Sequence, residues 1–156
     1  MGDGFRTALR TFARFGDFAG RSRRTELLLF WLLLMVANMI LMVASRPLGW
    51  AAYEWAMLGF QVAVALPTGA LFVRRLHDVG WSGWWLAPLI PIVALGIWER
   101  IQRIDDPFQP RFEPPLAVQI LAGLYAVAVM VLLFWDDQEG DNRYGPNPRT
   151  GPVETT

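Results

Sequence analysis

The side chains best able to do chemistry lie in three short polar segments of the chain. The middle segment, residues 74–78, reads Arg-Arg-Leu-His-Asp and brings two guanidinium groups, one imidazole and one carboxylate together. The other two segments lie at residues 20–26 and 142–148. From the three segments and the turn after the middle one we select a candidate polar cluster: Gly20, Arg21, Arg24, Glu26, Arg74, Arg75, His77, Asp78, Ser82, Trp84, Asn142, Arg143 and Tyr144.

Three kinds of function fit such a cluster. In a structural latch, Asp78 and Glu26 pair with arginines and fix the register of helix ends, because partly buried Arg binds carboxylates bidentately. Alternatively, the arginines bind an anionic lipid headgroup. In the third, His77 and Asp78 titrate during proton-coupled transport. The latch is our leading hypothesis, and transport is less favoured because the apolar runs contain no acid, His or Lys.

Catalysis has little support in these residues. His77 with one carboxylate would be a sparse zinc site, and the chain contains no Cys. Residues 80–83 are too short for a phosphate-binding glycine loop. Ser82 follows His77 across a glycine turn, where its hydroxyl is better placed to cap the third helix than to act as a nucleophile. We therefore expect no enzyme activity, no cofactor, no metal ion and no nucleic-acid partner.

Four apolar runs without charge must position these segments: residues 27–45, 55–73, 79–98 and 116–135. The 14 basic and 14 acidic residues all lie outside them. A helix needs about 20 residues to cross the ~30 Å hydrocarbon layer, and a charge at its middle costs a few kcal/mol. The sequence predicts an all-α, polytopic membrane protein with four transmembrane helices. Pro88 and Pro91 make the third run the least regular, so a short tilted helix or a re-entrant piece is the alternative there.

The remaining segments are polar or amphipathic. Residues 5–15 place Phe on one face of a helix and Arg on the other, which predicts an amphipathic N-terminal helix that lies on the membrane or packs on the helix ends. Residues 99–115 hold seven charged residues and four Pro, typical of a polar connector. We expect one membrane domain over residues 1–148 and a flexible tail over residues 149–156.

The distribution of arginine predicts how the chain is oriented. With a cytoplasmic N-terminus, ten Arg lie inside and only Arg46, Arg100, Arg103 and Arg111 lie outside. The positive-inside rule then places both termini in the cytoplasm, with all three polar segments at that face. Membrane lipid, through anionic headgroups, is the expected partner. Small residues four apart, such as Ala65 and Gly69, also permit a homo-oligomer.

The three segments resemble motifs of a family of small bacterial inner-membrane proteins, the domain of unknown function 805. The central motif, Arg-Arg-Leu-His-Asp followed by Gly and Ser-Gly-Trp-Trp, stands almost complete from Arg74 to Trp85. The family's first motif is matched by Gly20, Arg21, Arg24 and Glu26, and its last by Gly140 and residues 142–148.

The chain departs from that family's pattern in three places. Leu27 and Leu28 replace an aromatic pair, and Asp137 replaces a Gly. A charged connector and a further apolar run also separate the double Trp from Asn142, where similar proteins continue almost directly. The resemblance covers residues 18–148. It implies an inner-membrane location but no assigned reaction.

Overall fold

The computed structural model describes residues 13, 16–108 and 110–148 of the chain. Within them the fold is all-helical, as predicted. The amphipathic helix predicted at residues 5–15 lies outside the described residues except for Ala13. The α-helices are α2 (Arg24–Ser45), α3 (Trp50–Asp78), α4 (Leu89–Asp105) and α5 (Leu116–Phe134), and two short 3-10 helices are η1 (Arg46–Leu48) and η2 (Gly83–Leu86).

Each predicted span corresponds to a helical segment long and apolar enough to cross a bilayer. The segments are Arg24–Leu48, Trp50–Asp78, Gly83–Asp105 and Leu116–Phe134, with 25, 29, 23 and 19 residues. At 1.5 Å per residue, about 20 residues match the hydrocarbon thickness. The prediction of four transmembrane helices is therefore confirmed, and the third segment reaches the required length.

Two helices extend further than the charge-free runs. Helix α3 begins at Trp50 and includes the whole middle polar segment up to Asp78. Helix α4 continues to Asp105, so the prediction of a connector starting at residue 99 was wrong in its first half. Glu, Arg and Gln are good helix formers, and the next Pro is Pro107, so nothing ends the helix at the last apolar residue.

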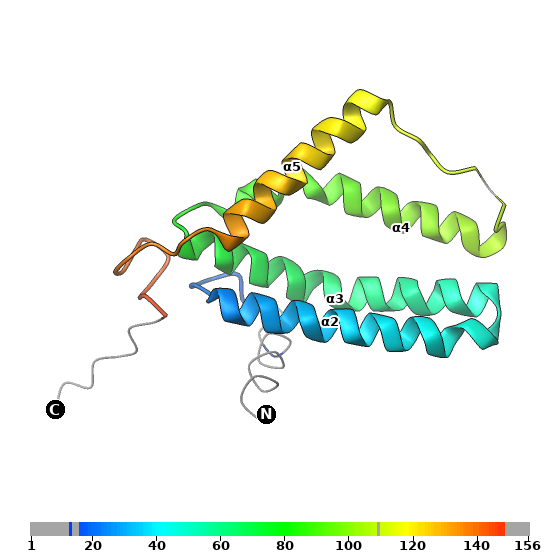
Figure 1. The fold of residues 1–156 in the computed structure, drawn as a ribbon, viewed down its shortest axis with the longest axis horizontal. Helices are drawn as coiled ribbons and strands as arrows, with labels where there is room; N and C mark the ends of the chain where they lie inside the picture. The colour runs from blue at the N-terminus through cyan, green and yellow to red at the C-terminus, as the bar shows by residue number, and fades with distance from the viewer. Residues whose placement is uncertain (1–12, 14–15, 109, 149–156) are drawn as a thin grey trace.

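Figure 1 shows α2 and α3 side by side, α4 along α3, and α5 inclined so that it meets α3 near one end only. The core lies at this end and is formed by six buried side chains, Leu27, Phe30, Leu71, Leu76, Val129 and Leu133. Trp31 fills its edge, with its ring centroid 6.2 Å from those of Phe72 and Phe134. The segments before α2 and after α5 both lie at this end of the helices (Figure 1).

A glycine turn ends α3 and fixes the direction of the chain after the middle polar segment. Gly80 has φ +86°, the Gly80 N–H donates to the His77 carbonyl (3.1 Å), and the Trp81 N–H donates to the Leu76 carbonyl (2.8 Å). This pairing satisfies two carbonyls at the helix end, and only glycine adopts such a φ without strain. A Cβ on Gly83 would lie 2.8 Å from a methyl group of Val73, so η2 packs directly against α3.

Candidate functional site

The centre of the polar cluster is Asp78, the last residue of α3. Its Oδ1 accepts a hydrogen bond from Arg21 Nε at 2.7 Å, and its Oδ2 accepts one from a terminal nitrogen of Arg75. The three residues are 2%, 6% and 0% exposed, respectively. Charges removed from water in this way are tolerated only when they are paired and fully hydrogen-bonded. Two of the three predicted segments therefore meet in a buried ion triad.

Arg75 connects the triad to the end of α5. Its Nε donates to the Leu133 carbonyl at 2.7 Å, and its second terminal nitrogen donates to the Trp135 carbonyl. The last carbonyls of a helix have no partner within the helix and carry partial negative charge, so a guanidinium group suits this position. One side chain thus binds the C-terminal end of α3 to the C-terminal end of α5.

Arg21 connects the same carboxylate to the chain after α5. Its two terminal nitrogens donate to the carbonyls of Gly140 (2.6 Å) and Gln138 (2.7 Å). The backbone N–H of Gln138 donates in turn to the Asp78 carbonyl at 2.9 Å. The segment before α2, the end of α3 and the segment after α5 are therefore joined by hydrogen bonds around Asp78.

Arg74, which is buried, and Glu26, which is partly buried, form a second pair beside the triad. Arg74 donates to Glu26 Oε1 at 3.4 Å and to the Asp17 carbonyl at 2.6 Å. The other Glu26 oxygen accepts from the Ser22 hydroxyl at 2.5 Å. Glu26 lies in the first turn of α2, where the helix dipole favours a carboxylate. This pair fixes the start of α2 against α3.

Arg24 behaves differently from the other arginines. It pairs with Asp136 and, at 3.3 Å, with Asp137, but its side chain is partly exposed and that of Asp136 is 86% exposed. Exposed pairs of this kind contribute about 0–1 kcal/mol. Arg24 therefore lies at the rim of the cluster rather than in its buried part.

The third predicted segment docks on α3 through His77. The His77 ring stacks on Tyr144 with centroids 3.8 Å apart and planes 5° apart, and the Arg143 guanidinium lies 4.7 Å from the Tyr144 centroid. His77 Nδ1 lies 3.3 Å from the Gly20 carbonyl oxygen, and Asn142 Nδ2 donates to the His77 carbonyl at 2.9 Å. All three sequence segments therefore touch.

Two predicted members lie outside this network. Ser82 caps η2, because its hydroxyl accepts from the Trp84 N–H at 3.4 Å. Its cap therefore belongs to the 3-10 helix that precedes α4, not to α4 itself. Trp84 is 82% exposed and so does not belong to the buried part of the cluster.

Several contributors were not recognised from the sequence. The acceptors at Gly140, Gln138, Leu133 and Trp135 are backbone carbonyls, which every residue has, so no sequence signal marks them. At the opposite end of α3, Glu54 is buried and accepts from Arg100 at 2.6 Å. Its position beside an apolar run was the only available signal for that pair.

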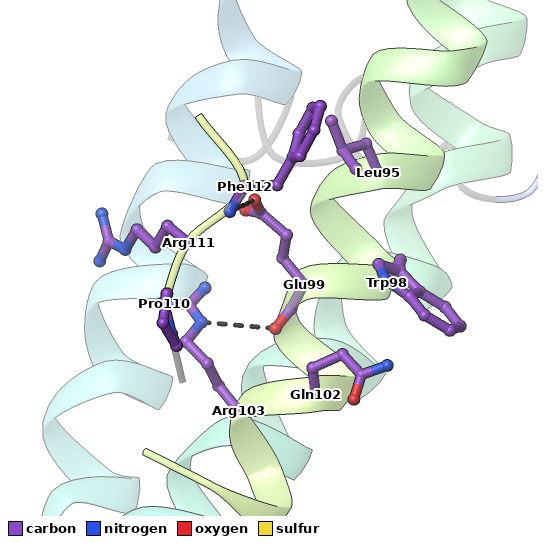
Figure 2. A pocket seen from close by; sticks show the side chains of 8 residues that line it. All are labelled: Leu95, Trp98, Glu99, Gln102, Arg103, Pro110, Arg111 and Phe112. Atoms are coloured by element: carbon purple, nitrogen blue, oxygen red, sulfur yellow. Dashed lines mark hydrogen bonds between the residues drawn. The ribbon is translucent and has the colours of Figure 1, made fainter. Parts of the chain in front are cut away.

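A separate pocket of about 370 Å³ lies at the C-terminal half of α4, away from the three segments. Figure 2 shows Glu99 extending from α4 toward the connector that carries Arg111 and Phe112. The Glu99 carboxylate accepts from the Phe112 N–H at 3.1 Å. Glu99 thus holds the connector against α4. No group of three or more His, Cys, Asp and Glu side chains in the described part of the chain could hold a metal ion.

Comparison with known proteins agrees with the three motifs. Residues 15–146 match the family model described as "Protein of unknown function (DUF805)". The chain is 27% identical to the Escherichia coli K12 inner membrane protein YhaH over 148 residues, which cover 92% of this chain and 97% of YhaH. It is also 27% identical to inner membrane protein YhaI of the same strain, over 92% of this chain and 95% of YhaI. No solved structure matches. The chain is a multi-pass inner-membrane protein, and it belongs to the DUF805 family.

Proposed function

We propose that this protein is a non-enzymatic scaffold or accessory protein of the inner membrane, in which the buried Arg and Asp cluster acts as a structural latch. The observation that carries the proposal is the use of the donors on Arg21 and Arg75. Every guanidinium nitrogen of these two residues donates to Asp78 or to a backbone carbonyl. A site that works by binding a ligand keeps some of its donors free, whereas a latch uses them internally.

The burial of the arginines argues against a lipid-headgroup binding site formed by them. Arg74 and Arg75 are 0% exposed, so a lipid phosphate has no access to them. Proton-coupled transport is equally poorly supported. The nearest acid towards the other end of α3 is Glu54, 24 residues before Asp78, which corresponds to about 36 Å of helix without an ionisable group except at the cluster itself.

We place the latch at the cytoplasmic face, with both termini in the cytoplasm. Contacts between Arg21 and Gly140 bring the segments at the two ends of the described chain to one end of the helices. Arg21, Arg24, Arg74 and Arg75 gather there, whereas Arg46 and Arg100 lie towards the opposite helix ends. Such an asymmetry is what the positive-inside rule associates with the cytoplasm. Reporter tags on the two termini test it, and opposite locations would refute the arrangement.

A double-mutant cycle on Arg21 and Asp78 tests the latch. Arg21→Gln and Asp78→Asn should each lower the free energy of unfolding in detergent by about 3–5 kcal/mol, because each leaves a buried charge short of a partner. The double variant should recover about 1–3 kcal/mol of the summed loss. The same cycle on Arg24 and Asp136 serves as the matched control and should show a coupling below about 1 kcal/mol. Additive losses at Arg21 and Asp78 would contradict the latch.

A further inference from the structure

A groove between α3 and the start of α4 is separate from the latch. Its volume is about 690 Å³, and its lining is apolar except for His77 and Ser82. Leu86 and Ile90 form the wall on the α4 side. Apart from the neighbouring backbone of α3 itself, no atom lies within 4 Å of the position that a Cβ on Gly69 would take, so there is open space above Gly69.

The groove runs along the axis of α3. Ala65, Gly69, Val73 and His77 all line it, and their four-residue spacing places them on one face of the helix. From residue 65 to residue 77 the helix rises about 18 Å. That is close to half of the ~30 Å hydrocarbon layer, the depth reached by one acyl chain of one leaflet. Because both walls are membrane spans, lipid is the solvent into which the groove opens.

A positive charge lies near the polar end of the groove, outside its lining and separated from the lining residue His77 by one aromatic ring. Tyr144 stacks on His77, and the exposed Arg143 guanidinium lies 4.7 Å from the Tyr144 centroid. Arg143 forms no ion pair among the described residues, in contrast to Arg21, Arg74 and Arg75. Trp84, at the same end, is exposed as aromatic residues at headgroup depth commonly are.

We infer that this groove binds one anionic phospholipid, with an acyl chain along Ala65, Gly69 and Val73 and the phosphate near Arg143 and His77. Charge complementarity selects the headgroup, because Arg143 is an exposed cation that forms no ion pair within the described part of the chain. The site uses none of the latch arginines. The sequence suggested that the arginines of the cluster bind the lipid headgroup, whereas this inference places the lipid in the groove.

Binding to the full-length protein in detergent micelles tests the inference. The probe is phosphatidylglycerol, with phosphatidylcholine of the same chains and chain-free glycerol phosphate as comparison ligands. Native mass spectrometry counts the retained lipid, and the melting temperature reports its effect. We expect one phosphatidylglycerol per protein, weaker retention of phosphatidylcholine, and no effect of glycerol phosphate. Equal retention of both lipids would overturn the headgroup assignment, and an effect of glycerol phosphate would show that a free anion suffices.

Gly69→Leu fills the groove and has a matched control. Leu at this position displaces about two methylene groups of the ligand, each worth about a factor of four, so phosphatidylglycerol should bind at least about tenfold more weakly. Gly59→Leu, on an exposed and open part of the same helix, should bind as the wild type does. If Gly69→Leu does not fold, Ala65→Leu blocks the groove one turn away. Unchanged binding in a folded groove variant would overturn the inference.

Arg143→Gln tests the contribution of the lipid headgroup separately from that of the acyl chain. This variant should lose about fivefold in its preference for phosphatidylglycerol over phosphatidylcholine, the equivalent of one cation near an anionic phosphate. Retention of the full preference would overturn the role of Arg143. A wild-type dimer that dissociates in Gly69→Leu would instead assign the groove to a second copy of the chain and would refute the lipid proposal. All of these outcomes are independent of the Arg21 and Asp78 cycle.

Discussion

Replacing Arg75 with Met should reveal what the buried triad contributes to stability. Arg75 is 0% exposed and donates through Nε to the Leu133 carbonyl at 2.7 Å, and through its terminal nitrogens to Asp78 and to the Trp135 carbonyl. Met keeps much of the apolar stem but none of the donors. Three acceptors in a buried or partly buried setting then lose a charged partner at once.

The expected loss can be placed within a range. Removing one partner of a buried ion pair costs about 3–5 kcal/mol. Asp78 would still hold Arg21 in the Arg75→Met variant, so the lower end, about 3 kcal/mol, applies there. Asp78→Asn removes the carboxylate that two buried guanidinium groups share, which places it near the upper end, about 5 kcal/mol. Arg24→Met removes two pairs of a partly exposed arginine, with Asp136 and Asp137, and should cost less than about 1 kcal/mol.

Equilibrium unfolding in mixed micelles gives these free energies. Hydrogen exchange locates the effect. Amides at residues 134–138 should exchange faster in Arg75→Met, because Arg75 binds the carbonyls of Leu133 and Trp135 at the end of α5. Their exchange should change little in Arg24→Met, because the pair with Asp136 is exposed. The order of destabilisation should be Asp78→Asn, Arg75→Met, Arg24→Met. If Arg75→Met lies within about 1 kcal/mol of wild type, the triad is not what holds these helix ends together.

Further expectations follow from the edges of the cluster. Gly80→Ala should lower the free energy of unfolding by about 1–3 kcal/mol, since φ is +86° and the new Cβ would lie 2.8 Å from Gln138 Oε1. Thermal unfolding measures the loss. Gly59→Ala, at an ordinary helical position, is the control and should show no loss. Tyr144→Ala should cost about 1–2 kcal/mol through loss of the stack on His77, and it should expose residues 142–148 to protease; an unchanged cleavage rate would argue against docking through this ring.

The four spans could be predicted from the sequence because charge is excluded from hydrocarbon, a constraint that acts on every residue of a run. The helix ends could not, since charged residues at the membrane surface continue a helix as readily as they end it. Helix α4 shows this most clearly, because it passes from Trp98 into Glu99 and Arg100 without a break.

The partners within the cluster depended on information that the sequence lacks. Four arginines and two acids allow many pairings, and only the packing of α2 on α3 selects Arg74 for Glu26 and Arg21 with Arg75 for Asp78. The docking of Asn142 and Tyr144 on His77 was within reach of motif reasoning, because it needed only that the three segments share one membrane face. The carbonyl acceptors on α5 and after it were not.

The triad also imposes an order on biogenesis. Arg21 is synthesised before Asp78, and the carbonyls of Leu133 through Gly140 are synthesised after both. Until α5 has entered the bilayer, Arg21 and Arg75 share one carboxylate, and the carbonyls of Leu133, Trp135, Gln138 and Gly140 are not yet in place. The guanidinium groups can then stay hydrated at the interface. Completion of the fourth helix is then the event that lets them leave water. A chain stalled before that event would keep its polar end open, which gives quality-control proteases a chemical difference between unfinished and finished molecules.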